Sequence, residues 1–175
     1  MMPQLSKEVP YSDTKISSAQ SKVDIEAILK EFGAEALRWT ETPESMKGLD
    51  CPILEFIVKT EIKGVEKHLG FRIKPPLLVQ RRRQYGRSGP IVETPALNQS
   101  MRLLWWWLKA KLEGVRFGLE SIEETLLSRV MVSLPSGEVR TAGEIIVPQL
   151  ISQTSQGLNM LPEFEIKKLV ATKEE

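Results

Sequence analysis

The chain has 175 residues, of which 41% are hydrophobic and 27% charged, a balance typical of one globular domain. Its net charge of +1 is too small to attract the whole protein to nucleic acid or to a membrane surface. A nucleic-acid role therefore requires a local basic patch. A single cysteine, Cys51, excludes an intramolecular disulfide framework and favours a reducing compartment, so we expect a cytoplasmic protein. The longest apolar run, residues 103–108, is too short to cross a bilayer, and residues 1–15 contain no hydrophobic signal segment.

The N-terminal quarter predicts an arm, a helix and a strand. Residues 1–17 are polar and turn-rich, which favours a flexible arm. A helix is predicted to begin at the N-cap Ser21 and to stop at Gly33. Its apolar residues recur at helical spacing: Val23, Ile25, Ile28, Leu29 and Phe32. Residues 34–40 then predict a short strand.

The clearest local pattern is a β-hairpin, residues 53–62 and 65–73, around Lys63-Gly64. A two-residue turn fixes its register. The predicted opposite pairs are Val58 with Leu69, Phe56 with Phe71, Leu54 with Ile73 and Glu55 with Arg72. One face is therefore almost wholly apolar, and a slip of one residue would destroy that sorting.

After Pro75-Pro76, residues 80–95 read QRRRQYGRSGPIVETP and predict a long loop, which is uncommon unless it is functional or disordered. Its basic part supplies the nucleic-acid-binding candidates Arg81, Arg82, Arg83, Tyr85 and Arg87. Arginines can hold phosphates while a tyrosine stacks on a base. The alternative is a solvated loop whose arginines pair with the chain's own acids.

Residues 97–119 predict the main helix, following Pro95. Its principal apolar stripe is Leu97, Met101, Leu104, Leu108, Leu112, Val115 and Leu119. A second stripe runs beside it: Leu103, Trp107, Ala110, Gly114 and Phe117. A helix this widely apolar is expected to be covered on two sides, by the sheet and by another helix or a partner chain.

Trp106 lies on the polar face of that helix, with Arg102 and Lys109 as neighbours. An exposed tryptophan between cations is a candidate interface anchor or stacking platform. The alternative is that a neighbouring loop covers it.

Two capping boxes mark later helices. Ser121 with Glu124 predicts a helix to about residue 127, and Thr141 with Glu144 predicts one over residues 142–153 that Pro148 kinks or limits. Between them, residues 130–134 and 139–141 predict a second hairpin. Residues 163–175 form a charged C-terminal tail, so the proposed organisation is an arm (1–17), one domain (18–162) and a tail.

No catalytic or metal site is predicted. The acids Glu113, Glu120, Glu123 and Glu124 have no spacing that forces them together on Mg²⁺. Cys51 and His68 are singletons that match no zinc pattern, and no phosphate-binding glycine loop with a GK[ST] ending occurs. We therefore expect no catalytic residue, metal or cofactor.

Residues 102–148, which carry Lys109-Ala110-Lys111-Leu112-Glu113 and later Leu134-Pro135 and Gly137, resemble a family of small proteins from phages, prophages and other mobile elements. The matching positions are Lys109, Ala110, Lys111, Leu112, Glu113, Val115, Gly118, Ile122, Glu123, Glu124, Leu127, Leu134, Pro135, Gly137 and Thr141. The opening helix matches as well, at Lys22, Ile25, Leu29, Gly33 and Ala34. The resemblance spans about half the chain and does not include Arg81 to Arg87. The sequence departs from the family pattern at Trp105 to Trp107 and at Leu126, and the resemblance implies no activity.

Together these patterns predict an α+β fold, with antiparallel β-hairpins forming a small sheet on a long central amphipathic helix. Three functions follow, in order of weight. The first is a non-enzymatic, mobile-element-encoded protein that binds nucleic acid or a nucleoprotein complex through residues 80–87. The second is a protein–protein adaptor, inhibitor or homo-oligomer that uses residues 97–119. The third is a metal-assisted enzyme.

Overall fold

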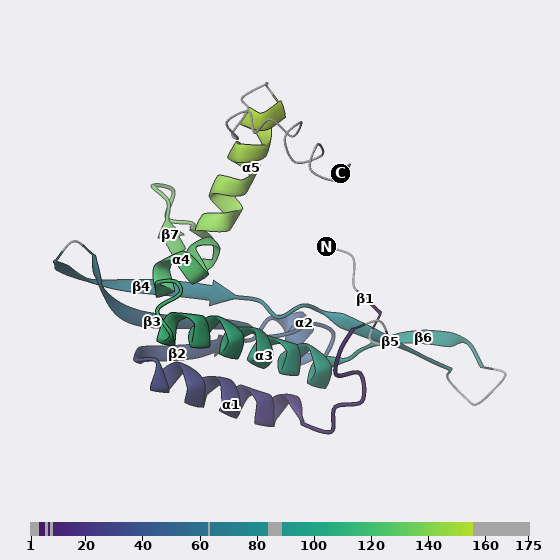
Figure 1. The fold of residues 1–175 in the computed structure, drawn as a ribbon. Coiled ribbons are helices and arrows are strands. Elements are labelled where there is room, and N and C mark those ends of the chain that lie inside the picture. The colour runs from purple at the N-terminus through teal and green to yellow at the C-terminus, as the bar shows by residue number, and fades with distance from the viewer. Residues whose placement is uncertain (1–3, 6, 8, 63, 84–88, 156–175) are drawn as a thin grey trace, which may run out of the picture.

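The computed structural model describes residues 4–5, 7, 9–62, 64–83 and 89–155. It confirms the α+β fold, with helix α3 (Leu97–Arg116) along its centre (Figure 1). None of the helices in these residues is long and apolar enough to span a membrane. The charged tail, residues 163–175, lies outside the described residues.

The central sheet has the strand order β2-β3-β4, formed by β2 (Ala34–Thr40), β3 (Ile53–Ile62) and β4 (Val65–Ile73). All pairs are antiparallel, and the predicted register is confirmed, including Phe56 opposite Phe71 and Glu55 opposite Arg72. Helices α1 (Ser18–Glu31) and α3 lie side by side on one face of this sheet (Figure 1).

The hydrophobic core fills the space between this sheet and the two helices. The rings of Phe56 and Phe71 stack there with their centroids 5.1 Å apart. The core residues are Ile25, Leu29, Leu54, Phe56, Val58, Phe71, Ile73, Met101, Leu104, Leu108, Leu112 and Leu126. The apolar residues that recur every second position in the strands therefore face the apolar residues that recur every three or four positions in the helices.

Helix α1 begins one turn earlier than predicted. Ser17, not Ser21, is the N-cap, and its hydroxyl accepts a hydrogen bond from the Gln20 N–H at 3.1 Å. Ser21 is fully buried inside the helix. The correction has a simple cause, because both serines are good caps and residues 18–20 are compatible with a helical turn.

Helix α3 is covered on two sides, as its width predicts: by the sheet and by α1. Leu103 and Trp107 of its second stripe are half-buried. The helix ends at Arg116, and Gly118 follows at φ +72°, a conformation that suits glycine. Phe117 and Leu119 remain 75% and 78% exposed.

Residues 80–95 are not a long loop. Strands β5 (Leu78–Arg83) and β6 (Ile91–Pro95) form an antiparallel hairpin, and β1 (Gln4–Leu5) joins β5 in parallel. The segment 84–88 between the two strands lies outside the described residues. Three β-branched residues, Ile91, Val92 and Thr94, are the sequence signal for a strand, whereas the neighbouring glycines and arginines favour a loop.

The later hairpin is separate from the central sheet. Strands β7 (Met131–Ser133) and β8 (Val139–Thr141) pair with each other. They are joined to the sheet by the bridge from Phe71 to Val130, just before β7, and by a hydrogen bond that Arg72 Nη1 donates to the Val139 carbonyl at 3.1 Å. The Met131 side chain lies over Gly70, where an added Cβ would lie 2.6 Å from the Met131 methyl carbon and would require that flexible side chain to move.

The remaining elements are short or peripheral. They are α2 (Pro43–Met46), α4 (Ile122–Leu126), the 3₁₀ helix η2 (Leu127–Arg129) and α5 (Ala142–Ser155). Both predicted capping boxes form, Ser121 with Glu124 and Thr141 with Glu144. Helix α5 continues through Pro148 rather than ending there.

A buried carboxylate lies on the face of the sheet opposite the core. The Glu55 side chain is 5% exposed and accepts hydrogen bonds from Arg38 Nε at 2.5 Å, Arg72 Nε at 2.7 Å and the Thr40 hydroxyl at 3.0 Å. Burial alone would raise the pKa of Glu55, but these three donors lower it by more, and the net shift is downward. The carboxylate therefore links all three strands of the sheet.

Glu55→Gln should destabilise the fold by about 2–3 kcal/mol, because two guanidinium groups lose their counter-charge beside a buried amide. Urea unfolding at neutral pH measures this change. Since the folded pKa of Glu55 is lowered, its contribution is present above the unfolded pKa and is lost as pH falls through the folded pKa. The stability difference between wild type and Glu55→Gln should therefore shrink in acid.

Glu61→Gln is the matched control, because Glu61 lies on the same face of β3 but is exposed. It should change stability by less than about 0.5 kcal/mol. Equal effects from the two substitutions would contradict the role assigned to Glu55.

Candidate nucleic-acid interface

The β5–β6 hairpin extends away from the core beyond the N-terminal end of α3 (Figure 1). Its base is fixed to that helix. The Leu78 N–H donates to the Ser100 hydroxyl at 3.1 Å, and the Ala96 N–H donates to the Leu78 carbonyl at 2.8 Å. Leu78 and Val79 are buried, so the hairpin leaves the core from an anchored position.

Three consecutive arginines occupy the outer half of β5. In the strand register Arg81 lies opposite Glu93, Arg82 opposite Val92 and Arg83 opposite Ile91. Because side chains alternate along a strand, Arg81 and Arg83 belong to the same face of the hairpin. Both residues are exposed.

The arginines are partly neutralised by the chain itself. Arg81 Nε lies 2.9 Å from a Glu93 carboxylate oxygen, and the two side chains are 58% and 47% exposed. Exposed pairs of this kind contribute little and exchange readily with other anions. Glu93 is the one acid in the described part of the hairpin. The predicted site residues Tyr85 and Arg87 lie outside the described residues.

A polar cavity of about 260 Å³ opens at the base of the hairpin. Its lining joins the N-terminal segment, the hairpin and the first turn of α3: Ser12, Thr14, Gln80, Pro95, Ala96, Leu97, Asn98 and Gln99. Ala96, the N-cap of α3, offers no side-chain cap. The Gln99 amide instead holds the N-terminal segment by donating to the carbonyls of Val9 and Pro10.

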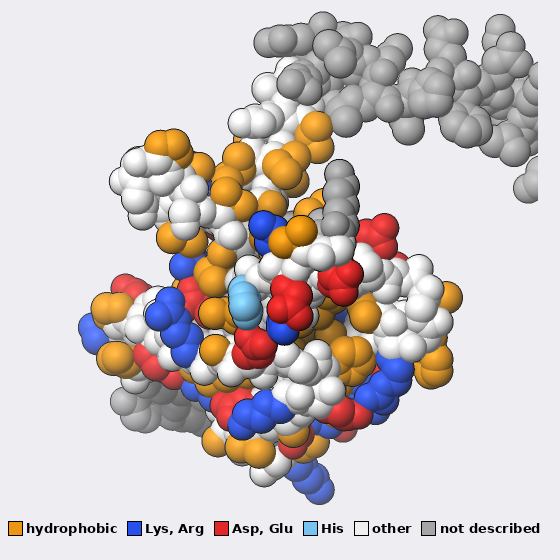
Figure 2. Space-filling model, turned by 90° about the vertical axis from the view of Figure 1, so that its left-hand side faces the viewer, with side chains coloured by type: hydrophobic (Ala, Val, Ile, Leu, Met, Phe, Trp, Pro, Cys, Tyr) orange, Lys and Arg blue, Asp and Glu red, His pale blue; other side chains and the backbone are white. Residues whose placement is uncertain are grey.

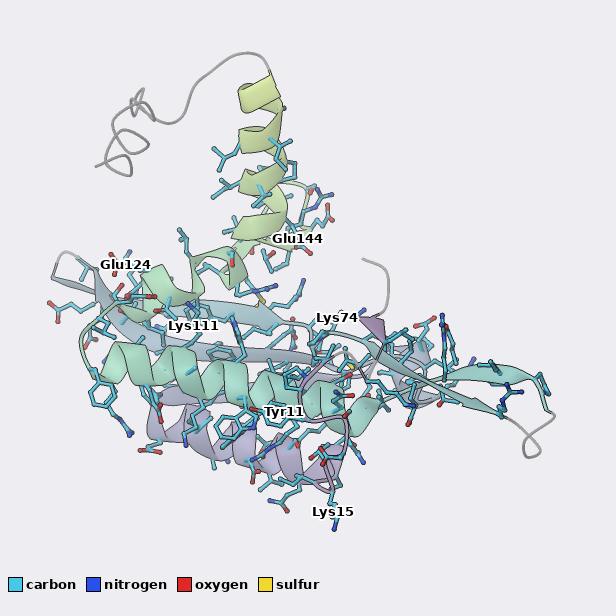
Figure 3. All side chains as sticks on the ribbon, turned by 45° about the vertical axis from the view of Figure 1, so that its right-hand side comes forward. Tyr11, Lys15, Lys74, Lys111, Glu124 and Glu144 are labelled. Atoms are coloured by element: carbon cyan, nitrogen blue, oxygen red, sulfur yellow. The ribbon has the colours of Figure 1, made fainter. Side chains whose placement is uncertain are left out.

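Trp106, the second candidate, is partly covered. Tyr11 stacks on it, with the ring planes 8° apart and the centroids separated by 5.8 Å (Figure 3). Trp106 is 39% exposed. Tyr11 of the predicted flexible arm thus lies against α3, so a neighbouring segment partly covers Trp106.

The two cations beside Trp106 have local partners as well. Arg102 lies 3.8 Å from the Trp105 ring centroid and pairs with Asp24 at 2.8 Å, and its side chain is 12% exposed. Lys109 lies within 6 Å of both rings, 5.3 Å from Trp105 and 5.7 Å from Trp106. This cluster joins α3 to α1 and to the N-terminal segment, and is less open than the hairpin.

The acidic residues do not converge. Glu113 pairs with Lys109, Glu120 accepts from Thr125, and Glu124 completes its capping box. Glu123 accepts a hydrogen bond from the Thr60 hydroxyl, which lowers its pKa. Within the described part of the chain, no group of three or more potential metal-binding side chains occurs.

Cys51 and His68 occupy different environments. Cys51 is fully buried, and His68 is a 60% exposed side chain on β4 that pairs with Glu35 at 3.0 Å. Burial raises the pKa of the Cys51 thiol to about 11, and the nearby Asp50 carboxylate adds to this shift. This environment opposes formation of the thiolate that a nucleophile requires.

Comparisons with protein-family models, with curated proteins and with solved structures give no match for this chain. The resemblance to mobile-element proteins therefore stays a prediction.

Cys51 should react with a thiol-specific disulfide reagent at least about 100-fold more slowly in the folded protein than in denaturant at pH 8, because a pKa of about 11 leaves little thiolate. Absorbance of the released thiolate measures the rate. A fast stoichiometric reaction in the folded state would contradict the buried assignment. The introduced cysteine of Lys67→Cys, at an exposed position on β4, provides the fast-reacting reference.

Proposed function

We propose that this chain is a non-enzymatic binding protein that contacts nucleic acid through the β5–β6 hairpin. The observation that carries the proposal is the run Arg81, Arg82 and Arg83 on one strand of a hairpin that extends from an anchored base. The resemblance of residues 102–148 to mobile-element proteins is compatible with this role and supplies no chemistry of its own.

The local charge of the hairpin supports this proposal. Lysines and arginines drive nucleic-acid binding by releasing counterions from phosphates, so a local excess of positive charge matters more than the net charge of +1. Three arginines against the single acid Glu93 give the described hairpin such an excess. The pair between Arg81 and Glu93 is exposed, and a phosphate can replace the carboxylate as the partner of that guanidinium.

Shape supports the same surface. A two-stranded antiparallel ribbon is narrow enough to enter the major groove of duplex DNA, where side chains on both of its faces reach phosphates or base edges. The fixed base at Leu78 and Ser100 limits the entropy that the hairpin loses on binding.

The second candidate, a protein–protein adaptor or inhibitor, is favoured by a different observation. An apolar cavity of about 290 Å³ runs along α3 beside Trp107. Its lining is Ile73, Lys74, Pro76, Leu103, Leu104, Trp107 and Arg129. Such a cavity suits an aliphatic side chain of a partner protein. Lys74 and Arg129, which line it, can pair with an acidic residue next to that side chain in the partner. The metal-assisted enzyme has no comparable observation in its favour.

The test is the triple substitution Arg81→Ala, Arg82→Ala and Arg83→Ala, measured by fluorescence anisotropy with labelled duplex DNA and single-stranded RNA over a salt series. Wild type should bind at low salt. On duplex DNA, the triple variant should make the negative slope of log affinity against log salt shallower by about 2–3, because each lost phosphate contact removes about 0.9 from its magnitude.

The matched control removes three exposed cations elsewhere, with Lys67→Ala, Arg116→Ala and Arg140→Ala. It carries the same net charge as the triple variant and should retain most of the affinity and slope. Absence of wild-type binding at low salt, or equal losses in both variants, would refute the hairpin as the site.

A further inference from the structure

Helix α5 carries a hydrophobic strip that the core does not cover. The helix leaves the body at its N-terminal end, where it packs on η2 and β8, and projects away from the sheet (Figure 1). Ile146, Val147, Leu150 and Ile151 are 43%, 48%, 36% and 61% exposed. Positions separated by three and four residues share a helix face, so these four side chains form one continuous strip. Figure 2 shows hydrophobic side chains along the projecting helix.

From this strip we propose that α5 is a dimerisation element that pairs with α5 of a second copy of this chain. The inference is independent of nucleic-acid binding. It rests on three properties of the strip: its charge, its area and its position at a projecting element.

The charge pattern favours a copy of the same chain over a charged partner. Residues 145–155 contain no charged side chain. Glu144 lies at the base of the helix, where its carboxylate accepts the Thr141 N–H at 2.8 Å. Two identical strips therefore meet without like-charge repulsion, whereas an acidic or basic partner would find no counter-charge on the strip.

The exposed area sets the strength of the pairing. The exposed fractions of the four residues correspond to about 350 Å² of surface on each copy, within the range of patches that are often functional on monomers. A standard stable interface buries about 800 Å² on each partner, so the strip predicts a weak dimer that forms as concentration rises.

The position of the helix allows closed two-fold symmetry. Because α5 is attached at one end, two copies aligned antiparallel place their bodies at opposite ends of the helix pair. The same surface then serves both copies, which is the requirement for an isologous dimer that does not grow into a filament.

The experiment measures the molar mass of the full-length chain by sedimentation or light scattering between about 1 and 500 µM, a range that brackets weak dissociation constants. The mass should rise from that of one chain toward twice that value. The variant Val147→Lys with Leu150→Lys should remain at the mass of one chain, and so should Val147→Glu with Leu150→Glu, because position 147 of one copy faces position 150 of the other in the antiparallel pair. An equimolar mixture of the two variants should regain the dimer, because opposite charges then face each other.

The control places the same charges on other exposed apolar residues, Phe117→Lys with Leu119→Lys. These residues are more exposed than the strip but lie beyond α3, so the dimer should persist. Near-ultraviolet circular dichroism, which reports the packed tryptophans, confirms that each variant is folded. A wild-type chain that stays monomeric, a dimer that survives both strip variants, or a mixture that stays monomeric would each overturn the proposal.

Discussion

The register between β3 and β4 is the constraint on which the rest of the structure depends. It places Phe56 opposite Phe71 on the face that α1 and α3 cover, and Glu55 opposite Arg72 on the other face. A slip of one residue would put the Glu55 carboxylate into the core. The two faces therefore reinforce each other, because the same pairing buries the aromatic rings and satisfies the buried acid.

This register also positions the candidate site. Strand β4 ends at Ile73 in the core, and a short connection leads to Leu78, where β5 begins. The Leu78 backbone is then held by Ser100 and Ala96 at the start of α3. Helix α3, which covers the core, therefore also fixes the direction in which β5 and its arginines leave the core. A basic segment without such an anchor would have to lose more conformational entropy when it binds.

The sequence predicted the elements whose patterns are local. The register of the first hairpin and both capping boxes follow from neighbouring residues, and all of them form. Two features depended on partners distant in sequence. Residues 80–83 and 91–95 become strands because β5 gains β1 as a neighbour and pairs with β6. Trp106 is partly covered by Tyr11, 95 positions away. The start of α1 could not be predicted to better than one turn, because Ser17 and Ser21 are both suitable N-caps.

The hairpin and α5 leave the core at different places, so the two proposed surfaces do not compete for the same space (Figure 1). Their combination has a physical consequence. A dimer joined through α5 carries two basic hairpins, and binding of the first raises the effective concentration of the second near the same nucleic acid. A weak contact made by three arginines then gains strength without any new contact within one chain. The gain depends on protein concentration, because it requires the helix pairing, whereas the salt dependence of each hairpin is set by its own arginines.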